Sequence, residues 1–144
     1  MAESELPLGL LVNDSDYLQL SRLLTEMVWR MDNGHAATIH ELFVEDGILN
    51  VSDIPVVGKD ALRDWGIAFD KAPLGFYHVI NNPRFVADGV DKAKGTSMLV
   101  AFLATEDGSG STVPAAVGID HDTFTRTPQG WRLASRRWQP LFTR

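Results

Sequence analysis

The spacing of apolar residues changes near Gly75, and this change limits the chain to a small set of folds. Before Gly75, large apolar side chains recur every three or four residues, as they do on one face of a helix. After it the period becomes two over four runs, residues 76–87, 93–105, 113–125 and 131–138. Helices followed by hairpin-connected strands predict an α+β domain whose helices cover one face of an antiparallel sheet.

Three helices are predicted in the first half, over residues 16–34, 35–43 and 59–71. Asn13 and the three residues after it are good N-cap candidates for the first helix, and Gly34 ends it. Between the second and third helices, residues 45–47 have the sequence Glu-Asp-Gly, which predicts a turn.

Composition and charge narrow the class of protein. The chain has 144 residues, of which 44% are hydrophobic and 22% charged, so residues 1–144 are predicted to form one globular domain with a flexible segment at 1–13. A net charge of −6 argues against nucleic acid or an anionic membrane as a partner. No cysteine is present, which excludes disulfides and thiol chemistry. The acidic start has no basic region typical of a signal peptide, so a cytoplasmic location is expected by default.

Two polar residues in apolar surroundings are candidates for chemistry. Asp32 follows Val28 by four residues, at the margin of the apolar face of the first helix. His78 lies within the first strand-like run. An acid and a histidine in such surroundings form a plausible proton-transfer pair. Alternatively, Asp32 caps the following segment and His78 is an ordinary hydrogen-bonded histidine.

The run over residues 96–103 is apolar on both of its alternating faces. One face can pack on the helices, and the other requires a second cover, such as a partner subunit. The sequence therefore predicts a homodimer or a higher homo-oligomer, joined through the outer face of the sheet.

Five short segments, in this order, resemble SnoaL-like proteins of the nuclear transport factor 2-like, or ketosteroid-isomerase-like, superfamily. They comprise residues 29–35 with 43–47, the histidine-bearing stretch 77–82, and residues 118–126, 130–133 and 136–137 of a closing hairpin. The resemblance extends over residues 14–140. It implies a cone-shaped barrel, in which a curved antiparallel sheet wraps around three helices and a pocket opens at one end.

In the scytalone dehydratase and hexachlorocyclohexane dehydrochlorinase relatives, an aspartate near the end of the first helix hydrogen-bonds a strand histidine. Asp32 and His78 fall on these two positions, which makes them the predicted catalytic residues. The resemblance also implies an apolar substrate pocket that needs no cofactor. Its predicted lining is Trp29, Met31, Trp65, Phe69, Met98, Val100, Phe124 and Trp138.

The chain also departs from the dehydratase pattern. Those enzymes carry a second histidine on the following strand and tyrosines that hold a water, whereas residues 96–103 here are almost entirely apolar and Met31 precedes Asp32. This argues against dehydration of the scytalone dehydratase kind. Asp120 stands where many relatives have tyrosine; it is either a second acid in the pocket or, as slightly favoured, a solvent-facing residue.

Metal and hydrolase sites have little support. His35 and His40 are five residues apart and so lie on different sides of a helix. His121 lies between Asp120 and Asp122, but adjacent strand residues point to opposite faces. No metal site is predicted, and no Gly-x-Ser-x-Gly motif is present.

Three functions remain open. The leading hypothesis is a cofactor-independent lyase, isomerase or cyclase, in which His78 takes a proton from a hydrophobic, cyclic substrate and Asp32 orients it. The second is a non-catalytic module of the same fold that binds a small molecule or another chain. The third is the small β-subunit of a ring-hydroxylating dioxygenase, which would require an iron-bearing partner chain.

Overall fold

The computed structural model describes residues 8–73, 75–107 and 109–143. The first half holds the helices α1 (Asp14–Asp32), η2 (Ala36–Leu42, a 3₁₀ helix) and α2 (Lys59–Asp70), with the strands β1 (Phe43–Asn50) and β2 (Val56–Val57) between η2 and α2. The second half holds four long strands, β3 (Phe76–Ala87), β4 (Lys92–Leu103), β5 (Ala116–Thr127) and β6 (Gly130–Thr143). No helix in these residues is long and apolar enough to cross a membrane.

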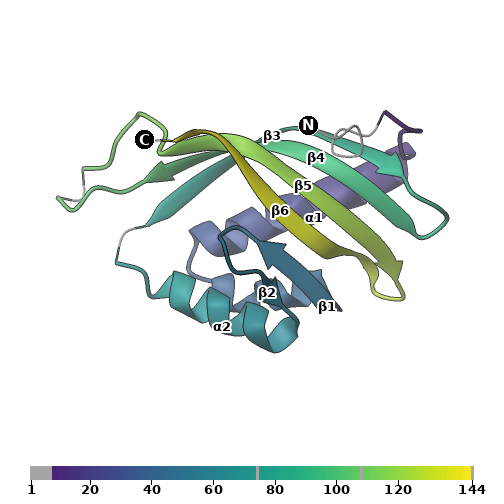
Figure 1. The fold of residues 1–144 in the computed structure, drawn as a ribbon, viewed down its shortest axis with the longest axis horizontal. Helices are drawn as coiled ribbons and strands as arrows, with labels where there is room; N and C mark the ends of the chain where they lie inside the picture. The colour runs from purple at the N-terminus through teal and green to yellow at the C-terminus, as the bar shows by residue number, and fades with distance from the viewer. Residues whose placement is uncertain (1–7, 74, 108, 144) are drawn as a thin grey trace.

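The strands form one curved sheet in the order β2-β1-β6-β5-β4-β3. The four long strands pair antiparallel, as expected, whereas β1 joins β6 in parallel, so the sheet is mixed. The sheet arches over α1, with η2 and α2 on the same side, and does not close on itself (Figure 1). The predicted α+β fold with a curved sheet around three helices is therefore confirmed.

Residues 45–47 do not form the separate turn that was predicted, since they lie inside β1. The pairing of β1 with β6 is irregular between Phe43 and Ile48, and Gly47 lies within this stretch. A Cβ on Gly47 would lie 2.8 Å from the Cβ of Phe43, and the Gly47 carbonyl accepts a hydrogen bond of 2.9 Å from Gly58 N. The residues typical of a turn thus produce an irregularity within a strand.

The first residues that the structure describes run beside β3. Ala87 N donates to Leu10 O at 2.8 Å, and Val12 N donates to Phe85 O at 3.1 Å. These bonds hold part of the segment that was predicted to be flexible; residues 1–7 of that segment lie outside the described residues.

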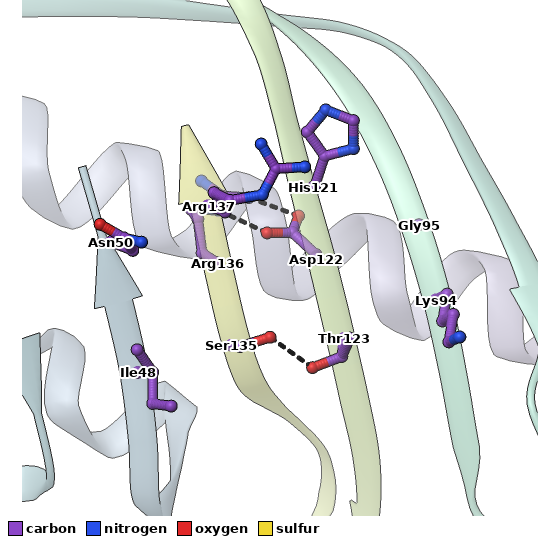
Figure 2. A pocket seen from close by; sticks show the side chains of 10 residues that line it. All are labelled: Ile48, Asn50, Lys94, Gly95, His121, Asp122, Thr123, Ser135, Arg136 and Arg137. Atoms are coloured by element: carbon purple, nitrogen blue, oxygen red, sulfur yellow. Dashed lines mark hydrogen bonds and ion pairs between the residues drawn. The ribbon is translucent and has the colours of Figure 1, made fainter. Parts of the chain in front are cut away.

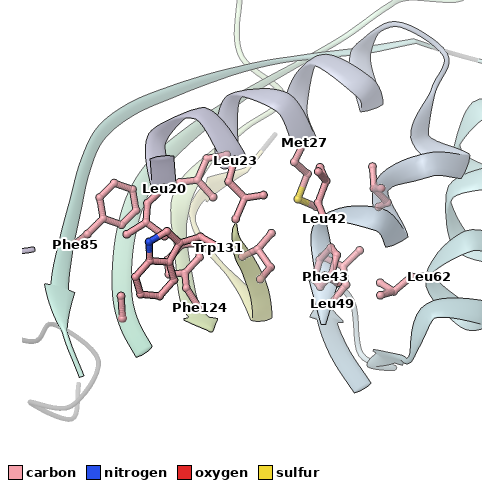
Figure 3. Close-up of a cluster of buried hydrophobic side chains, with 14 residues drawn as sticks. Leu20, Leu23, Met27, Leu42, Phe43, Leu49, Leu62, Phe85, Phe124 and Trp131 are labelled. Carbon is pink, nitrogen blue, oxygen red and sulfur yellow. The ribbon is translucent and has the colours of Figure 1, made fainter. Parts of the chain in front are cut away.

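The hydrophobic core occupies one end of the space between helices and sheet. Leu20 of α1 meets Phe85, Phe124 and Trp131 from the long strands (Figure 3). The strand residues of this group lie near the hairpin ends of β3, β5 and β6. The inner face at the opposite end of the strands is left for the cavity described below.

Close packing fixes η2 against α2. A Cβ on Gly66 of α2 would lie 2.0 Å from the carbonyl oxygen of Ala36, so only glycine allows this approach. The Asp70 carboxylate, at the end of α2, accepts hydrogen bonds of 2.9 Å from both Ala36 N and Ala37 N. These contacts hold η2 and α2 together beside the end of α1.

Candidate active site

Asp32 and His78 meet at the end of α1. Asp32 is the last residue of α1. The next residue, Asn33, caps the helix, and its backbone N–H donates a hydrogen bond to Trp29 O. One Asp32 oxygen lies 2.5 Å from His78 Nδ1, and the other accepts a 2.8 Å hydrogen bond from His78 N. The two side chains are 9% and 8% exposed, so water has little access to the pair.

This contact determines which imidazole nitrogen can act as a base. An ionised carboxylate only accepts hydrogen bonds, so the proton of a neutral His78 ring lies on Nδ1. Nε2 then carries the lone pair, and no described residue donates a hydrogen bond to it. The ring is stacked on Phe76, with centroids 5.8 Å apart and planes inclined by 16°. The carboxylate and the aromatic ring thus hold the imidazole in one orientation.

His78 lines an apolar cavity of about 310 Å³ between the helices and the sheet. This volume is at the lower end of the range of about 300–1,000 Å³ that small-molecule pockets occupy. The other lining residues are Met27, Val28, Met31, Leu49, Val51, Trp65, Phe69, Phe76, Leu99, Ala101, Ala116, Asp120, Arg136 and Trp138. Apart from His78, the ionisable side chains among the described residues that line it are Asp120 and Arg136.

Four of the predicted pocket residues line this cavity: Met31, Trp65, Phe69 and Trp138. Trp65 and Phe69 stack on one another with centroids 5.3 Å apart, as their helical spacing suggested. Asp32 supports the cavity wall from behind His78.

Met98 and Val100 were placed on the wrong face of β4. Leu99 and Ala101 face the cavity, so their neighbours Met98 and Val100 point to the outer face of the sheet. Both faces of this strand are apolar, and the sequence alone did not distinguish them.

Trp29 and Phe124 also lie outside the cavity. Trp29 is 53% exposed and stacks on His35, because it is two residues from both Met27 and Met31 and so points away from their face of α1. Phe124 is in the core, 1% exposed and in edge contact with Phe85. It shares the inner face of the sheet with the cavity residues but lies farther along β5.

Asp120 is buried, which corrects the preference for a solvent-facing position. Asp120 is 1% exposed and lies beside Arg136, whose Nη1 approaches Asp120 Oδ2 at 3.3 Å. Arg136 also makes two hydrogen bonds to Asp122, of 2.8 and 2.9 Å (Figure 2). Burial raises the pKa of Asp120 to about 6, and the charge of Asp122 acts in the same direction, while Arg136 opposes both.

The sequence held a signal for this placement. Asp120, Asp122 and Phe124 alternate along β5, so they share one face, and the predicted place of Phe124 in the pocket lining implied that both acids point to the inside of the sheet. Arg136, which sequence reasoning did not single out as a pocket residue, lies opposite Asp122 in the pairing of β5 with β6.

A second, polar hollow of about 440 Å³ lies on the other face of the sheet (Figure 2). Lys94, His121 and Arg137 line it, and His121 Nε2 lies 2.7 Å from Gln139 Oε1. Among the described residues, no group of three histidine, aspartate or glutamate side chains is placed to hold a metal ion.

Comparison with known proteins places this geometry in a family. The sequence profile of the SnoaL-like domain matches residues 15–137. Comparison with curated proteins finds no match.

Similar solved structures include three from Novosphingobium aromaticivorans. A nuclear transport factor 2-like protein with a cystatin-like fold has a TM-score of 0.73 and 25% identity over 88% of this chain and 82% of that chain. A candidate scytalone dehydratase has a TM-score of 0.76 and 17% identity over 89% and 85%. The β subunit of a candidate aromatic-ring-hydroxylating dioxygenase has a TM-score of 0.74 and 20% identity over 92% and 94%. The chain belongs to the family of SnoaL-like domains, within the nuclear transport factor 2-like superfamily.

Proposed function

We propose that this protein is a cofactor-independent enzyme of the lyase, isomerase or cyclase type, which removes a proton from carbon in a hydrophobic, cyclic substrate. The observation that carries the proposal is the contact of 2.5 Å between Asp32 and His78 Nδ1 at the wall of an apolar cavity. Buried acid–histidine pairs of this kind, beside a cavity that fits a small molecule, are typical of proton-transfer sites.

His78 acts as the base through Nε2. As the proton leaves carbon, the ring becomes an imidazolium, and the Asp32 carboxylate stabilises that charge through Nδ1. The low exposure of both side chains strengthens this interaction, because little water screens it. A base and its orienting acid are sufficient for proton abstraction, so the proposed reaction requires no cofactor.

The walls of the cavity indicate the substrate class. Phe69 stacks on both Trp65 and Phe76, with centroid separations of 5.3 and 5.8 Å, which provides a flat aromatic surface. Such surfaces favour flat or cyclic apolar molecules. A hydrophobic ring with an acidic C–H bond beside a carbonyl or a leaving group fits both the wall and the base.

Two alternatives keep the fold and differ in function. A non-catalytic binding module would use the cavity without proton transfer. A dioxygenase β-subunit would use the fold to bind an iron-bearing partner chain, as the similarity in fold to the Novosphingobium β subunit allows. The buried Asp32–His78 pair favours the enzyme, because neither alternative needs an imidazole with a free nitrogen facing a cavity.

Proton exchange tests the proposal without knowledge of the natural substrate. The α-protons of 2-tetralone, a two-ring ketone, exchange with D₂O when a base removes them, and ¹H NMR measures the rate. Wild-type protein should accelerate this exchange, and His78→Ala should lose the acceleration while it keeps its fold and binds the ketone. His35→Ala is the matched control, since His35 lies outside the cavity and stacks on Trp29. Equal exchange by His78→Ala and wild type would refute the proposed base; no exchange by wild-type protein that binds the ketone would favour the binding module.

We also propose that two copies associate through the outer face of the sheet. Val79, Val100 and Val117 lie side by side across β3, β4 and β5 on the face away from the helices. Tyr77 and Phe142 extend this apolar surface, and both are exposed in the single chain. A second copy would cover it and remove its apolar area from water.

A further inference from the structure

The polar hollow on the outer face of the sheet concentrates positive charge on an acidic chain. The chain has a net charge of −6, yet three cationic side chains, Lys94, Arg136 and Arg137, line this hollow of about 440 Å³. Among the described lining residues the one carboxylate is Asp122, which accepts two hydrogen bonds from Arg136, of 2.8 and 2.9 Å. Lys94 and Arg137 therefore leave the hollow with an excess of positive charge.

Strand register brings the polar lining residues together in two adjacent rows (Figure 2). One row crosses β1, β6 and β5, and the other crosses β6, β5 and β4, two residues nearer the hairpin that joins β5 to β6. The first comprises Asn50, Arg137 and His121, and the second Ser135, Thr123 and Lys94. Lys94 and Arg137 are two strands apart, about 10 Å by strand spacing. Their long side chains can therefore contact one anion that lies above β5.

Several donors in these rows have no acceptor in the part of the chain that the structure describes. The Asn50 amide makes no hydrogen bond there. Thr123 Oγ1 and Ser135 Oγ lie 2.6 Å apart, and a bond between two hydroxyls uses one of their two hydrogens, so one O–H remains. The ion pair of Lys94 with Asp88, at 3.9 Å, is too long for a hydrogen bond. An amide, a hydroxyl and an ammonium group can thus all donate to a ligand.

We propose that this hollow binds the phosphate group of a small organic molecule. Lys94 and Arg137 supply the positive charge, and a guanidinium has five N–H groups, so Arg137 can hold an anion in addition to its contacts within the protein. Asn50 and the hydroxyl pair add uncharged donors from neighbouring strands. Donors on four strands suit a tetrahedral phosphate better than a planar carboxylate, which has only two oxygens. The inference is independent of the proposed reaction, because the hollow and the cavity lie on opposite faces of the sheet.

The size and place of the hollow fit an organic phosphate that enters from solvent. Its volume of about 440 Å³ is within the range of about 300–1,000 Å³ that small-molecule pockets occupy, so a bare phosphate ion would fill only part of it. Ile48, which is 38% exposed, adds an apolar edge. Val117, in the proposed interface between two copies, precedes His121 by four residues, about 13 Å along β5. The hollow therefore lies beside that interface.

An NMR titration of the ¹⁵N-labelled protein tests the inference at neutral pH and constant ionic strength. The probes are inorganic phosphate, glycerol 3-phosphate and acetate, which are too polar to favour the apolar cavity. Both phosphates should shift the signals of the His121 ring and of Arg137 Nε–H in a saturable way, with a Kd of about 1 mM or below. Glycerol 3-phosphate should bind at least as tightly as inorganic phosphate, and acetate at least about tenfold more weakly, because it has less charge and fewer oxygens.

Substitutions assign the binding to the hollow. Lys94→Gln and Arg137→Gln should each weaken phosphate binding about tenfold or more, as expected for the loss of one charge-assisted hydrogen bond. Lys92→Gln is the matched control, since Lys92 lies two residues from Lys94 on the same face of β4 and does not line the hollow. This control should change the Kd less than about twofold. Asn50→Asp keeps the shape of the side chain and adds a negative charge, so it should also weaken binding about tenfold or more.

The absence of saturable shifts with both phosphates would overturn the inference. Equal losses in Lys92→Gln and Lys94→Gln would also overturn it, since they would indicate attraction by general surface charge. Acetate binding as tight as that of phosphate would contradict the assignment to a phosphate group. Sedimentation with vesicles that contain phosphatidic acid distinguishes the source, because binding to vesicles without binding of glycerol 3-phosphate would contradict a small molecule from solvent. Lys94 is half-exposed, so Lys94→Gln should fold and decide the matter if Arg137→Gln does not.

Discussion

Asp32→Asn tests whether the acid–histidine pair works as a unit. Both oxygens of the Asp32 carboxylate face His78, one toward the backbone N–H and one toward Nδ1. The backbone N–H is a fixed donor, so an asparagine must turn its carbonyl oxygen to it. Its NH₂ group then faces Nδ1, which forces the imidazole proton to Nε2. The variant therefore holds the ring in place and removes the lone pair that faces the cavity.

The size of the effect follows from these contacts. A wrong tautomer costs about 10⁴ in rate when the aspartate of a Ser-His-Asp triad is changed to asparagine, and a loss of similar order is expected in the exchange of 2-tetralone protons. The variant keeps both hydrogen bonds to His78 but removes the negative charge of the acceptor. Neutral hydrogen bonds contribute about 1 kcal/mol less than charge-assisted ones, so the free energy of unfolding should fall by about 1–2 kcal/mol. For a domain of this size, that is a fall of roughly 3–7 °C in Tm.

Asp70→Asn is the matched control for stability. Its carboxylate also accepts two hydrogen bonds from backbone N–H groups, those of Ala36 and Ala37, but it does not line the cavity. This variant should lose at least as much stability, measured by thermal unfolding, because asparagine can accept only one of these two hydrogen bonds, and it should keep its exchange rate. Exchange by Asp32→Asn within a few fold of wild type would refute the tautomer argument. An equal loss of exchange in both variants would attribute the effect to stability.

Three further predictions concern packing, pH and assembly. Gly66→Ala should lower the free energy of unfolding by about 1–3 kcal/mol in urea titrations, because the alanine Cβ would lie 2.0 Å from Ala36 O. Alanine has the higher helix propensity, so a gain in stability would contradict this close approach. Because the pKa of Asp120 is about 6 in the folded protein, above its ordinary value of 3.8, its contribution to stability is present below pH 4 and lost as pH rises through 6. Asp120→Asn should therefore raise the free energy of unfolding, relative to wild type, more at pH 7 than at pH 4, and an equal difference at both would count against the raised pKa. Val79→Glu, opposite Val100 on the outer face, should convert a homodimer to monomers in sedimentation analysis, and a wild-type protein that is already monomeric would disprove the interface.

Local patterns in the sequence determined the elements and the two members of the acid–histidine pair. The helical spacing before Gly75 and the alternation after it follow from side-chain periodicity, which depends only on nearby residues. The strand predicted over residues 76–87 agrees with β3, and Asn13 caps α1 through a hydrogen bond to Asp16 N. Asp32 and His78 were identified as anomalies in apolar surroundings and through a family resemblance, and the fold brings them into contact.

Only the tertiary structure decided which face of each strand meets the helices and how β1 is paired. Along β4 either face is apolar, so alternation alone gave no reason to choose Leu99 over Met98 for the cavity. The partner of β1 is β6, more than eighty residues away, and this long-range pairing places a turn-like sequence inside a strand. Alternation along β5 places Asp120 on the same face as Phe124, but the cation beside it, Arg136, comes from β6, and periodicity along one strand does not contain this contact. Periodicity determines whether a segment forms a helix or a strand, whereas the register and the neighbouring strand determine where its side chains lie.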